Sequence, residues 1–366
     1  MAFRDGWSHR WPIAIHADSV ITSPVSTWPC LITDVHFPAG AWAHMNADAS
    51  DLRFSSDKAG TVELYYDAPR ISVAGQSAHL YVQVPTLAST KDTTIYAWVG
   101  NAAATAPSAA WMQNTYPADW AAFWPMEEGA GVTVGDRTAN ANHGTLTNGP
   151  TWAAGEGGAV VECAEPDDFV DCGAMPQLLG AAQITVIVRC RVNAIADFQP
   201  LWAQAVGPNA SNGIAISAGS VGSLNHYYYK VSAGSNSFGI VIGALDIGTW
   251  HTEALVFDGS GANNAARLKA YRDGTALSIA AVLGTIPAAT SSTPNPFRLN
   301  AFNTAGPRPA ITFAYACALS RALSADELKV HHAQFTPATW AQAGKLVAVG
   351  GGAVPMIYRA ARRRSR

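Results

Sequence analysis

Charge is what this sequence lacks most. Asp, Glu, Lys and Arg together make up 13% of the 366 residues, and the formal net charge is −3. A weakly acidic chain has no general attraction for nucleic acid or for anionic membranes, so nucleic acid is not an expected partner. The sequence also lacks any run of about 20 apolar residues, so we expect no membrane insertion by a helix.

Cysteine is scarce as well, and its five copies are scattered: Cys30, Cys163, Cys172, Cys190 and Cys317. The number is odd and no Cys-x-x-Cys pair is present, which argues against both a zinc site and a disulfide framework. We expect buried free thiols. The spacing leaves open a bridge between Cys163 and Cys172, should a hairpin bring the two together.

The first residues carry no apolar segment or cleavage site of the kind found in secretory signal peptides. We therefore expect a protein that reaches its place without such a signal. At the other end, residues 337–366 form an extended tail that finishes in a basic segment. Such tails are ordered only when something holds them. We expect neighbouring subunits to do so through Tyr358, Arg359, Arg362, Arg363 and Arg364.

Apolar residues and turn formers are abundant. Hydrophobic residues make up 49% of the chain, with 32 Gly and 21 Pro. Runs such as 93–99, rich in β-branched and aromatic residues, end at turn formers, and residues 1–112 show no helical repeat. This pattern predicts an all-β protein with many short strands. The length suggests two or three domains.

The clearest local pattern is a β-hairpin. An apolar-rich strand at 250–258 is followed by a loop of turn formers, a second strand at 267–271 and an Asp273-Gly274 exit. This hairpin resembles the central hairpin of laminin-G-like domains, which have the concanavalin A-type lectin/glucanase fold.

Further segments extend that resemblance over most of residues 119–336, in the family's order. They are the strand at 122–131, an Asp-x-x-x-Asn-x-Asn-x-Gly loop at 136–144, strands at 167–173 and 184–189, and a closing signature at 319–328. In that signature Ser324 and Glu327 predict a capping box, and Leu323 and Leu328 a hydrophobic staple. A short helix should therefore run from Ala325 to about residue 335, with Leu328 and His332 on one face.

The N-terminal part carries a different set of motifs, at 6–13, 47–54, 84–87 and 93–96. They resemble an uncharacterised bacterial and phage domain that often precedes a concanavalin-like module. The two resemblances together imply two tandem β-sandwich (jelly-roll) domains, at 1–112 and 113–336. The second is expected to be concanavalin A-like and to end in one short helix, before the extended tail.

Catalysis on this fold would require two carboxylates converging on a glycosidic bond, about 5 Å apart in a retaining enzyme. The Glu-x-Asp-x-x-Glu strand that supplies them in glucanases is absent from the sequence. Glu127 and Glu128 are adjacent, so a strand would point them to opposite faces. We expect both to be structural and predict no catalytic residue; a glycan-cleaving enzyme remains the alternative.

One acidic cluster suits calcium. Asp167, Asp168 and Asp171 lie close in sequence and would need further oxygens from a second loop, such as those of Asp136 or Asn142. Many laminin-G-like domains bind calcium at a loop rim, so the resemblance makes calcium a candidate cofactor. A solvated turn before a strand is the simpler explanation.

The run 225–230 suggests a carbohydrate surface. As a strand it alternates between two faces, and one of the two sets should line a concave sheet where rings stack on sugars. The sets are Asn225, Tyr227 and Tyr229 on one face, and His226, Tyr228 and Lys230 on the other. Trp202 is a weaker candidate. Ordinary sheet packing explains the same residues.

Together these patterns predict a non-enzymatic, surface-displayed structural protein that binds glycans. The pairing of the two resemblances is familiar in phage tail and fibre genes, and a virion protein assembles in the cytoplasm without an export signal. We therefore expect a phage tail, fibre or capsid decoration protein. Its partners would be other virion subunits or copies of itself, and host-surface glycans. An exported bacterial adhesin is a further alternative.

Overall fold

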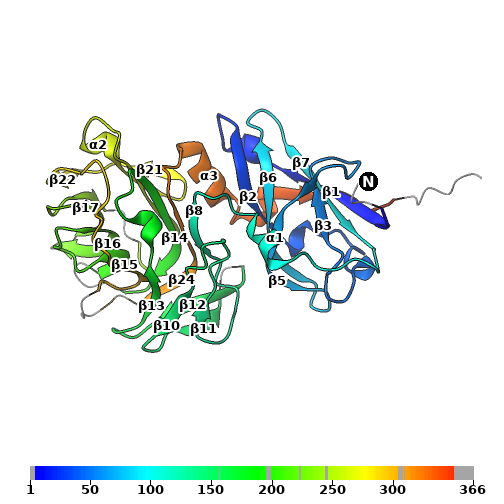
Figure 1. The fold of residues 1–366 in the computed structure, drawn as a ribbon, viewed down its shortest axis with the longest axis horizontal. Coiled ribbons are helices and arrows are strands. Elements are labelled where there is room, and N and C mark those ends of the chain that lie inside the picture. Colours follow the sequence, from blue (N-terminus) through cyan, green and yellow to red (C-terminus); the bar gives the residue numbers. More distant parts are fainter. Residues whose placement is uncertain are drawn as a thin grey trace, which may run out of the picture.

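The computed structural model describes residues 5–155, 157–194, 199–221, 224–243, 246–303, 308 and 310–349. Their strands form four sheets, which pack in pairs. Figure 1 shows the resulting two β-sandwiches side by side, one blue and cyan, the other mainly green and yellow. The prediction of an all-β protein with tandem sandwiches is confirmed.

The second sandwich begins with a nine-stranded sheet in the order β22-β18-β17-β16-β15-β23-β13-β10-β9. Its strands are β9 (Thr133–Val134), β10 (Gly144–Thr147), β13 (Phe169–Ala174), β15 (Gln199–Ala205), β16 (Gly213–Val221), β17 (Leu224–Ser232), β18 (Phe238–Ile242), β22 (Ala281–Leu283) and β23 (Pro296–Leu299).

An eight-stranded sheet packs on it, in the order β11-β12-β24-β14-β19-β20-β21, with β8 beside β24. Its strands are β8 (Trp120–Trp124), β11 (Thr151–Ala154), β12 (Ala159–Cys163), β14 (Gln183–Val192), β19 (Trp250–Asp258), β20 (Leu268–Arg272), β21 (Thr275–Leu277) and β24 (Ile311–Leu319). The predicted hairpin is β19 and β20, which pair antiparallel.

The eight-stranded sheet is buried on both faces. On β19, Leu255 and Phe257 belong to the core between the two sheets of this sandwich. Ala254 and Val256, which point the other way, belong to a core shared with the first sandwich. A strand that is covered on both sides needs apolar residues at successive positions, which explains the uninterrupted run 254–257.

The first sandwich combines a six-stranded sheet, in the order β25-β1-β7-β3-β4 with β26 beside β1, and a three-stranded sheet β2-β6-β5. The strands are β1 (His9–Ile15), β2 (Val25–Thr33), β3 (Arg53–Ser55), β4 (Glu63–Leu64), β5 (Tyr66–Ser72), β6 (Ser77–Leu87), β7 (Thr93–Val99), β25 (Ala341–Ala343) and β26 (Val347–Ala348). The last two follow the second sandwich in sequence, so the chain returns to pair with β1.

The helices are short: α1 (Ala109–Gln113), α2 (Asn264–Arg267), α3 (Ala325–Ala333) and α4 (Pro337–Trp340), with 3-10 turns at Ala17–Ser19, Asp34–His36, Trp42–His44 and Pro176–Leu178. The predicted helix is α3, and its capping box between Ser324 and Glu327 is present. Leu328 is buried as expected, but His331, and not His332, is the buried histidine of the helix. No helix in the described part of the chain is long and apolar enough to cross a membrane.

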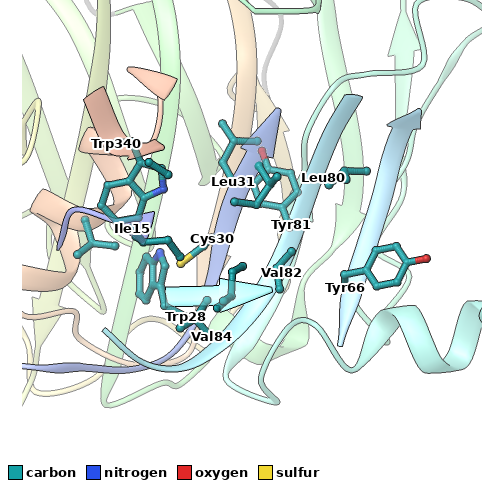
Figure 2. Close-up of a cluster of buried hydrophobic side chains, with 14 of the residues drawn as sticks. Ile15, Trp28, Cys30, Leu31, Tyr66, Leu80, Tyr81, Val82, Val84 and Trp340 are labelled. Carbon is teal, nitrogen blue, oxygen red and sulfur yellow. The ribbon is translucent and has the colours of Figure 1, made fainter. Parts of the chain in front are cut away.

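Aromatic rings join the two sandwiches into one packed body. Trp28 of β2 lies 5.6 Å from Trp120 of β8, and Tyr81 of β6 lies 4.7 Å from Phe123, both edge-on. Figure 2 shows this part of the core, with Leu31 beside Tyr81 and the α4 residue Trp340 beside Ile15. All five cysteines are buried and free, so Cys163 and Cys172 form no bridge.

Candidate functional site

Three of the predicted carbohydrate-binding side chains lie inside the second sandwich. Trp202 and Tyr229 have 0% of their surface exposed and Tyr227 has 1%. All three belong to the core between the nine- and eight-stranded sheets. A ring closed in on both faces offers nothing for a sugar to stack on, so the structure corrects the expectation for these three residues.

A buried ionic network holds the two tyrosines in the core. The Tyr229 hydroxyl donates to Glu253 Oε2 at 3.0 Å, and Arg272 Nε donates to Glu253 Oε1 at 2.6 Å. The Arg272 guanidinium also lies 5.1 Å from the centre of the Tyr227 ring. Burial raises the pKa of Glu253 more than Arg272 and Tyr229 lower it. The tyrosines therefore satisfy a charge pair within the fold.

The other set of the same strand points away from the core. His226, Tyr228 and Lys230 lie on this second face of the nine-stranded sheet, which we call the distal face. Cross-strand pairing sets Ser217 of β16 opposite Tyr228, and Phe238 of β18 opposite Lys230. The side chain of Asn225, on the same strand, lies outside the described residues.

Tyr228, Lys230, Phe238 and Ser217 line a small hollow on the distal face, together with Pro208. The rings of Tyr228 and Phe238 meet edge-on at 5.5 Å, and they are 6% and 9% exposed. The free space is about 10 Å³, roughly that needed by one water. The hollow has no room for a sugar ring, so a sugar could touch only the few atoms of these side chains that are exposed.

Lys230 is the polar centre of the distal face. Its Nζ donates to the side-chain oxygen of Asn236. Burial lowers the pKa of this lysine to about 8, because a charged amine is poorly solvated there. At neutral pH the amine of Lys230 is therefore mostly protonated, and the side-chain oxygen of Asn236 stabilises its charge.

The predicted calcium ligands are not brought together. Asp136 is 4% exposed, and its two carboxylate oxygens accept backbone N–H groups of Phe123, Thr138 and Asn142 at 2.8–2.9 Å. The Asn142 side chain donates to the Ala121 carbonyl. Both residues organise the loop between β9 and β10, and the two carboxylate oxygens of Asp136 are already engaged.

Two of the three other predicted ligands also have structural partners. Asp168 Oδ2 accepts two backbone N–H groups, from Ala164 and Glu165, both at 3.0 Å. Asp171 pairs with Arg298 at 2.9 Å, and Asp167 is exposed in the intervening turn. Throughout the described ranges, no group of three or more acidic, His or Cys side chains is placed to hold a metal. The structure thus corrects the calcium prediction for these residues.

Glu127 and Glu128 have different surroundings. Glu127 Oε2 lies 2.7 Å from Arg70 Nε and Glu127 Oε1 lies 2.9 Å from His79 Nδ1, both in the first sandwich. Burial alone would raise the pKa of Glu127, but the bonds and charges of His79 and Arg70 outweigh it and lower that pKa. Glu128 Oε1 accepts the Gly135 N–H at 2.9 Å. Both carboxylates are therefore held by other groups of the fold.

The predicted assembly residues Tyr358, Arg359, Arg362, Arg363 and Arg364 lie outside the described residues. The segment just before them is placed, because Val349 N donates to the Ser8 carbonyl at 2.7 Å.

His331, on α3, is 1% exposed and is surrounded by rings of Trp28, Trp120 and Tyr315. It has no hydrogen-bond partner among the described residues, so it is a packing residue here.

Sequence reasoning missed most of the distal hollow, since Pro208, Ser217 and Phe238 come from separate segments. One signal was available. The run Gly-Ile-Ala-Ile-Ser-Ala-Gly at 213–219 places large residues on one face and Ala215 and Ser217 on the other. Period-two alternation places the small side chains of this strand together on one face.

No known protein family matches the sequence, and no curated protein matches it. Among solved structures, domain 4 of AbnA, a GH43 extracellular arabinanase from Geobacillus stearothermophilus in complex with arabinotriose, is similar at 14% identity and a TM-score of 0.40, over 58% of this chain and 97% of that one. The botulinum neurotoxin type G receptor binding domain is similar at 10% identity and a TM-score of 0.41, over 59% of this chain and 51% of that one. A Trypanosoma rangeli sialidase is similar at 9% identity and a TM-score of 0.44, over 72% of this chain and 42% of that one. This chain thus spans about half the length of the toxin domain and less than half of the sialidase; likenesses of this size say nothing of function.

Proposed function

We propose that this protein is a non-enzymatic, surface-displayed structural protein of a phage virion that binds host-surface glycans through the distal face. One observation carries the glycan part. The register of β16, β17 and β18 sets two aromatic rings, a lysine and a serine around one hollow outside the core. Rings beside hydrogen-bonding groups are the chemistry that recognises a sugar.

The geometry of the hollow also sets the strength of binding. With Tyr228 and Phe238 less than 10% exposed, a sugar gains contact with ring edges and few hydrogen bonds. We expect affinities near ~1 mM for a single site. Many copies on one particle raise the effective affinity by about 10²–10⁴ without any new contact. A weak site therefore suits a protein displayed in many copies.

The structural part of the proposal rests on the joint between the two sandwiches. They share a core that includes Trp28, Trp120 and Tyr315, and β25 and β26 bring the chain back to β1. A unit closed in this way transmits force without a mobile linker, as a tail, fibre or capsid decoration requires. The pairing of the two sequence resemblances supports the same assignment.

Binding is tested with a glycan array probed by the full chain coupled to a multivalent carrier. Lys230→Met and Tyr228→Phe remove polar groups of the hollow and should lower the retained signal at least threefold. Tyr65→Phe is the matched control, because Tyr65 is 39% exposed on the first sandwich. Equal signals from all three variants would remove the distal face from the proposal.

The enzyme alternative has its own readout. A panel of polysaccharides is incubated with the protein and scored for new reducing ends. We expect no new reducing ends above background; sustained turnover that is lost in Glu127→Gln or Glu128→Gln would overturn the non-enzymatic assignment.

Immunogold microscopy of purified particles tests the virion assignment. The assignment fails if the label appears on cell envelopes and never on particles.

A further inference from the structure

A cavity of about 180 Å³ lies where the two sandwiches meet. The first sandwich contributes neighbouring side chains of β2 and β6, since Leu31 pairs with Tyr81 and Thr33 with His79. The eight-stranded sheet contributes the pair Arg189 and Tyr315, from β14 and β24. Pro125, Glu127, Gly157, Ala314 and Phe335 complete the wall. Neither sandwich forms this space alone.

Three polar side chains form a chain of contacts along one part of the wall. His79 Nδ1 lies 2.9 Å from Glu127 Oε1, and His79 Nε2 lies 3.0 Å from the Tyr81 hydroxyl. Because Glu127 is an acceptor, it favours the His79 tautomer that carries its proton on Nδ1, and in that tautomer Nε2 accepts from Tyr81. The second carboxylate oxygen of Glu127 is held by Arg70 at 2.7 Å. We call Glu127, His79 and Tyr81 the relay.

The relay is arranged for binding rather than for nucleophilic attack. Burial, with the negative charge of Glu127 next in importance, raises the pKa of the Tyr81 phenol well above 10. Tyr81 therefore stays protonated at neutral pH and acts as a hydrogen-bonding group. The carboxylate of Glu127 is the strong acceptor of the set, because charged acceptors form the stronger hydrogen bonds.

Most of the remaining wall is apolar, with Thr33 and Arg189 as its other polar side chains. Leu31, Pro125 and Ala314 line it together with the rings of Tyr315 and Phe335. The negative charge of Glu127 is already matched by Arg70, while Arg189 donates to Thr252 Oγ1 at 3.0 Å and lies over the Phe335 ring at 5.9 Å. A neutral molecule with one polar edge matches such a wall better than an ion does.

The volume limits the size of an occupant. A protein cavity of about 150 Å³ holds benzene, so 180 Å³ admits one six-membered ring with one or two small substituents. A pyranose, which carries polar groups all round its ring, would leave several of them unpaired against Leu31, Pro125 and Phe335.

We propose that this cavity binds a small neutral aromatic compound carrying one or two hydroxyl groups, of the phenol or catechol type. The ring packs against Leu31, Tyr315 and Phe335, and the hydroxyl donates to Glu127 within the relay. The site is separate from the distal face and independent of glycan binding. Since its walls come from both sandwiches, the ligand also stabilises their joint.

The test is calorimetric titration of the full chain with phenol and catechol, beside benzene, benzoate and glucose, together with the melting temperature at each concentration. We expect phenol and catechol to bind at one site per chain and raise the melting temperature. Benzene should bind about 10- to 150-fold more weakly, which is the range of one hydrogen bond to a charged group. Benzoate and glucose should be weaker still.

Variants separate the cavity from the rest of the surface. Ala314→Leu fills the cavity and should lower phenol affinity at least ~10-fold with the fold intact by circular dichroism. Ala276→Leu, on the exposed strand β21, is the size-matched control and should leave affinity unchanged. Glu127→Gln should reduce the preference of phenol over benzene, because a neutral acceptor forms the weaker hydrogen bond, while benzene still binds.

Several outcomes would overturn the proposal. They are the absence of binding by any ring compound, equal affinity for benzene and phenol, tighter binding of benzoate or glucose, and loss of binding in Ala276→Leu to the same extent as in Ala314→Leu. Glycan-array signals that persist in Ala314→Leu show that the two sites are independent, and a failure of one leaves the other standing.

Discussion

Tyr229 of β17 donates its hydroxyl proton to the fully buried carboxylate of Glu253 on β19, 3.0 Å away. The bond crosses the core of the second sandwich, from the nine-stranded sheet to the eight-stranded one. It explains why a tyrosine that looks like a ligand-binding residue in the sequence is completely enclosed. The buried Glu253–Arg272 pair needs this donor, since a buried charge is stable only when its oxygens are satisfied.

Glu253→Ala should destabilise the protein by about 3–5 kcal/mol, because the substitution leaves the Arg272 guanidinium buried without its partner. Tyr229→Phe removes one hydrogen bond to a charged group and should cost about 1.5–3 kcal/mol. Urea unfolding of the full chain, followed by tryptophan fluorescence, measures both. Tyr65→Phe, at an exposed ring, is the control; a Tyr229→Phe effect no larger than that control contradicts the role given to the bond.

Acid should lower the free energy of unfolding through the protonation of His331. Burial, with small contributions from His332 and Arg189, lowers the pKa of this histidine to about 3, while in the unfolded chain it titrates near 6.5. Between these values the unfolded state binds a proton that the folded state does not. The free energy of unfolding therefore falls as the pH drops from 6.5 towards 3, by at most ~1.4 kcal/mol per pH unit from this group.

His331→Phe should flatten that part of the pH profile, measured as urea midpoints between pH 4 and 7. The exposed His143 offers a control, because His143→Phe leaves the buried group in place. Identical pH slopes in the wild type and in His331→Phe would mean that another group carries the acid sensitivity.

Lys230 should act at the alkaline end. Its pKa is about 8 in the folded protein and near 10.4 when unfolded, so above pH 8 the folded state has lost a proton that the unfolded state still holds. Stability from this group therefore rises from about pH 8 to about pH 10. Lys230→Met should remove the rise, and thermal melts between pH 7.5 and 10 measure it. A wild-type profile that falls throughout this window contradicts the shift.

Three truncations test the C-terminal strands and the tail. Deleting 341–366 removes β25 and β26 and exposes the edge of β1, which should lower the stability of the first sandwich and speed amide exchange at His9–Ile15. Deleting 350–366 keeps both strands and should leave exchange unchanged while abolishing incorporation into particles. Normal incorporation of the shorter deletion would disprove the anchoring role of the tail. A deletion of 345–366, which removes β26 alone, should leave both sandwiches folded.

Local patterns in the sequence predicted local structure well. The capping box of α3 involves residues three positions apart, so Ser324 and Glu327 could be recognised without knowledge of the fold. The hairpin of β19 and β20 is similarly local. Alternation along 225–230 also predicted the two faces of β17 correctly, but it could not tell which face meets the core. The opposing sheet decides which face is buried, because Glu253 on that sheet accepts the hydrogen bond of the Tyr229 hydroxyl.

Contacts between distant segments lay beyond such reasoning. The cavity wall combines Leu31 and Tyr81 with Arg189 and Tyr315, and only the docking of two sandwiches brings them together. The calcium prediction at Asp136 was wrong because a carboxylate that accepts backbone N–H groups can occur at the same sequence spacing as a calcium ligand. Their difference lies in which atoms they face, and sequence spacing does not report that.

The return of β25 to β1 fixes an order of events during synthesis. More than 300 residues separate these strands, so at about 5–20 residues per second the ribosome needs roughly 15–60 s to deliver the missing edge. Throughout that interval β1 has an open hydrogen-bonding edge, and every strand of the second sandwich is synthesised before β25. The half that is made first is therefore completed last.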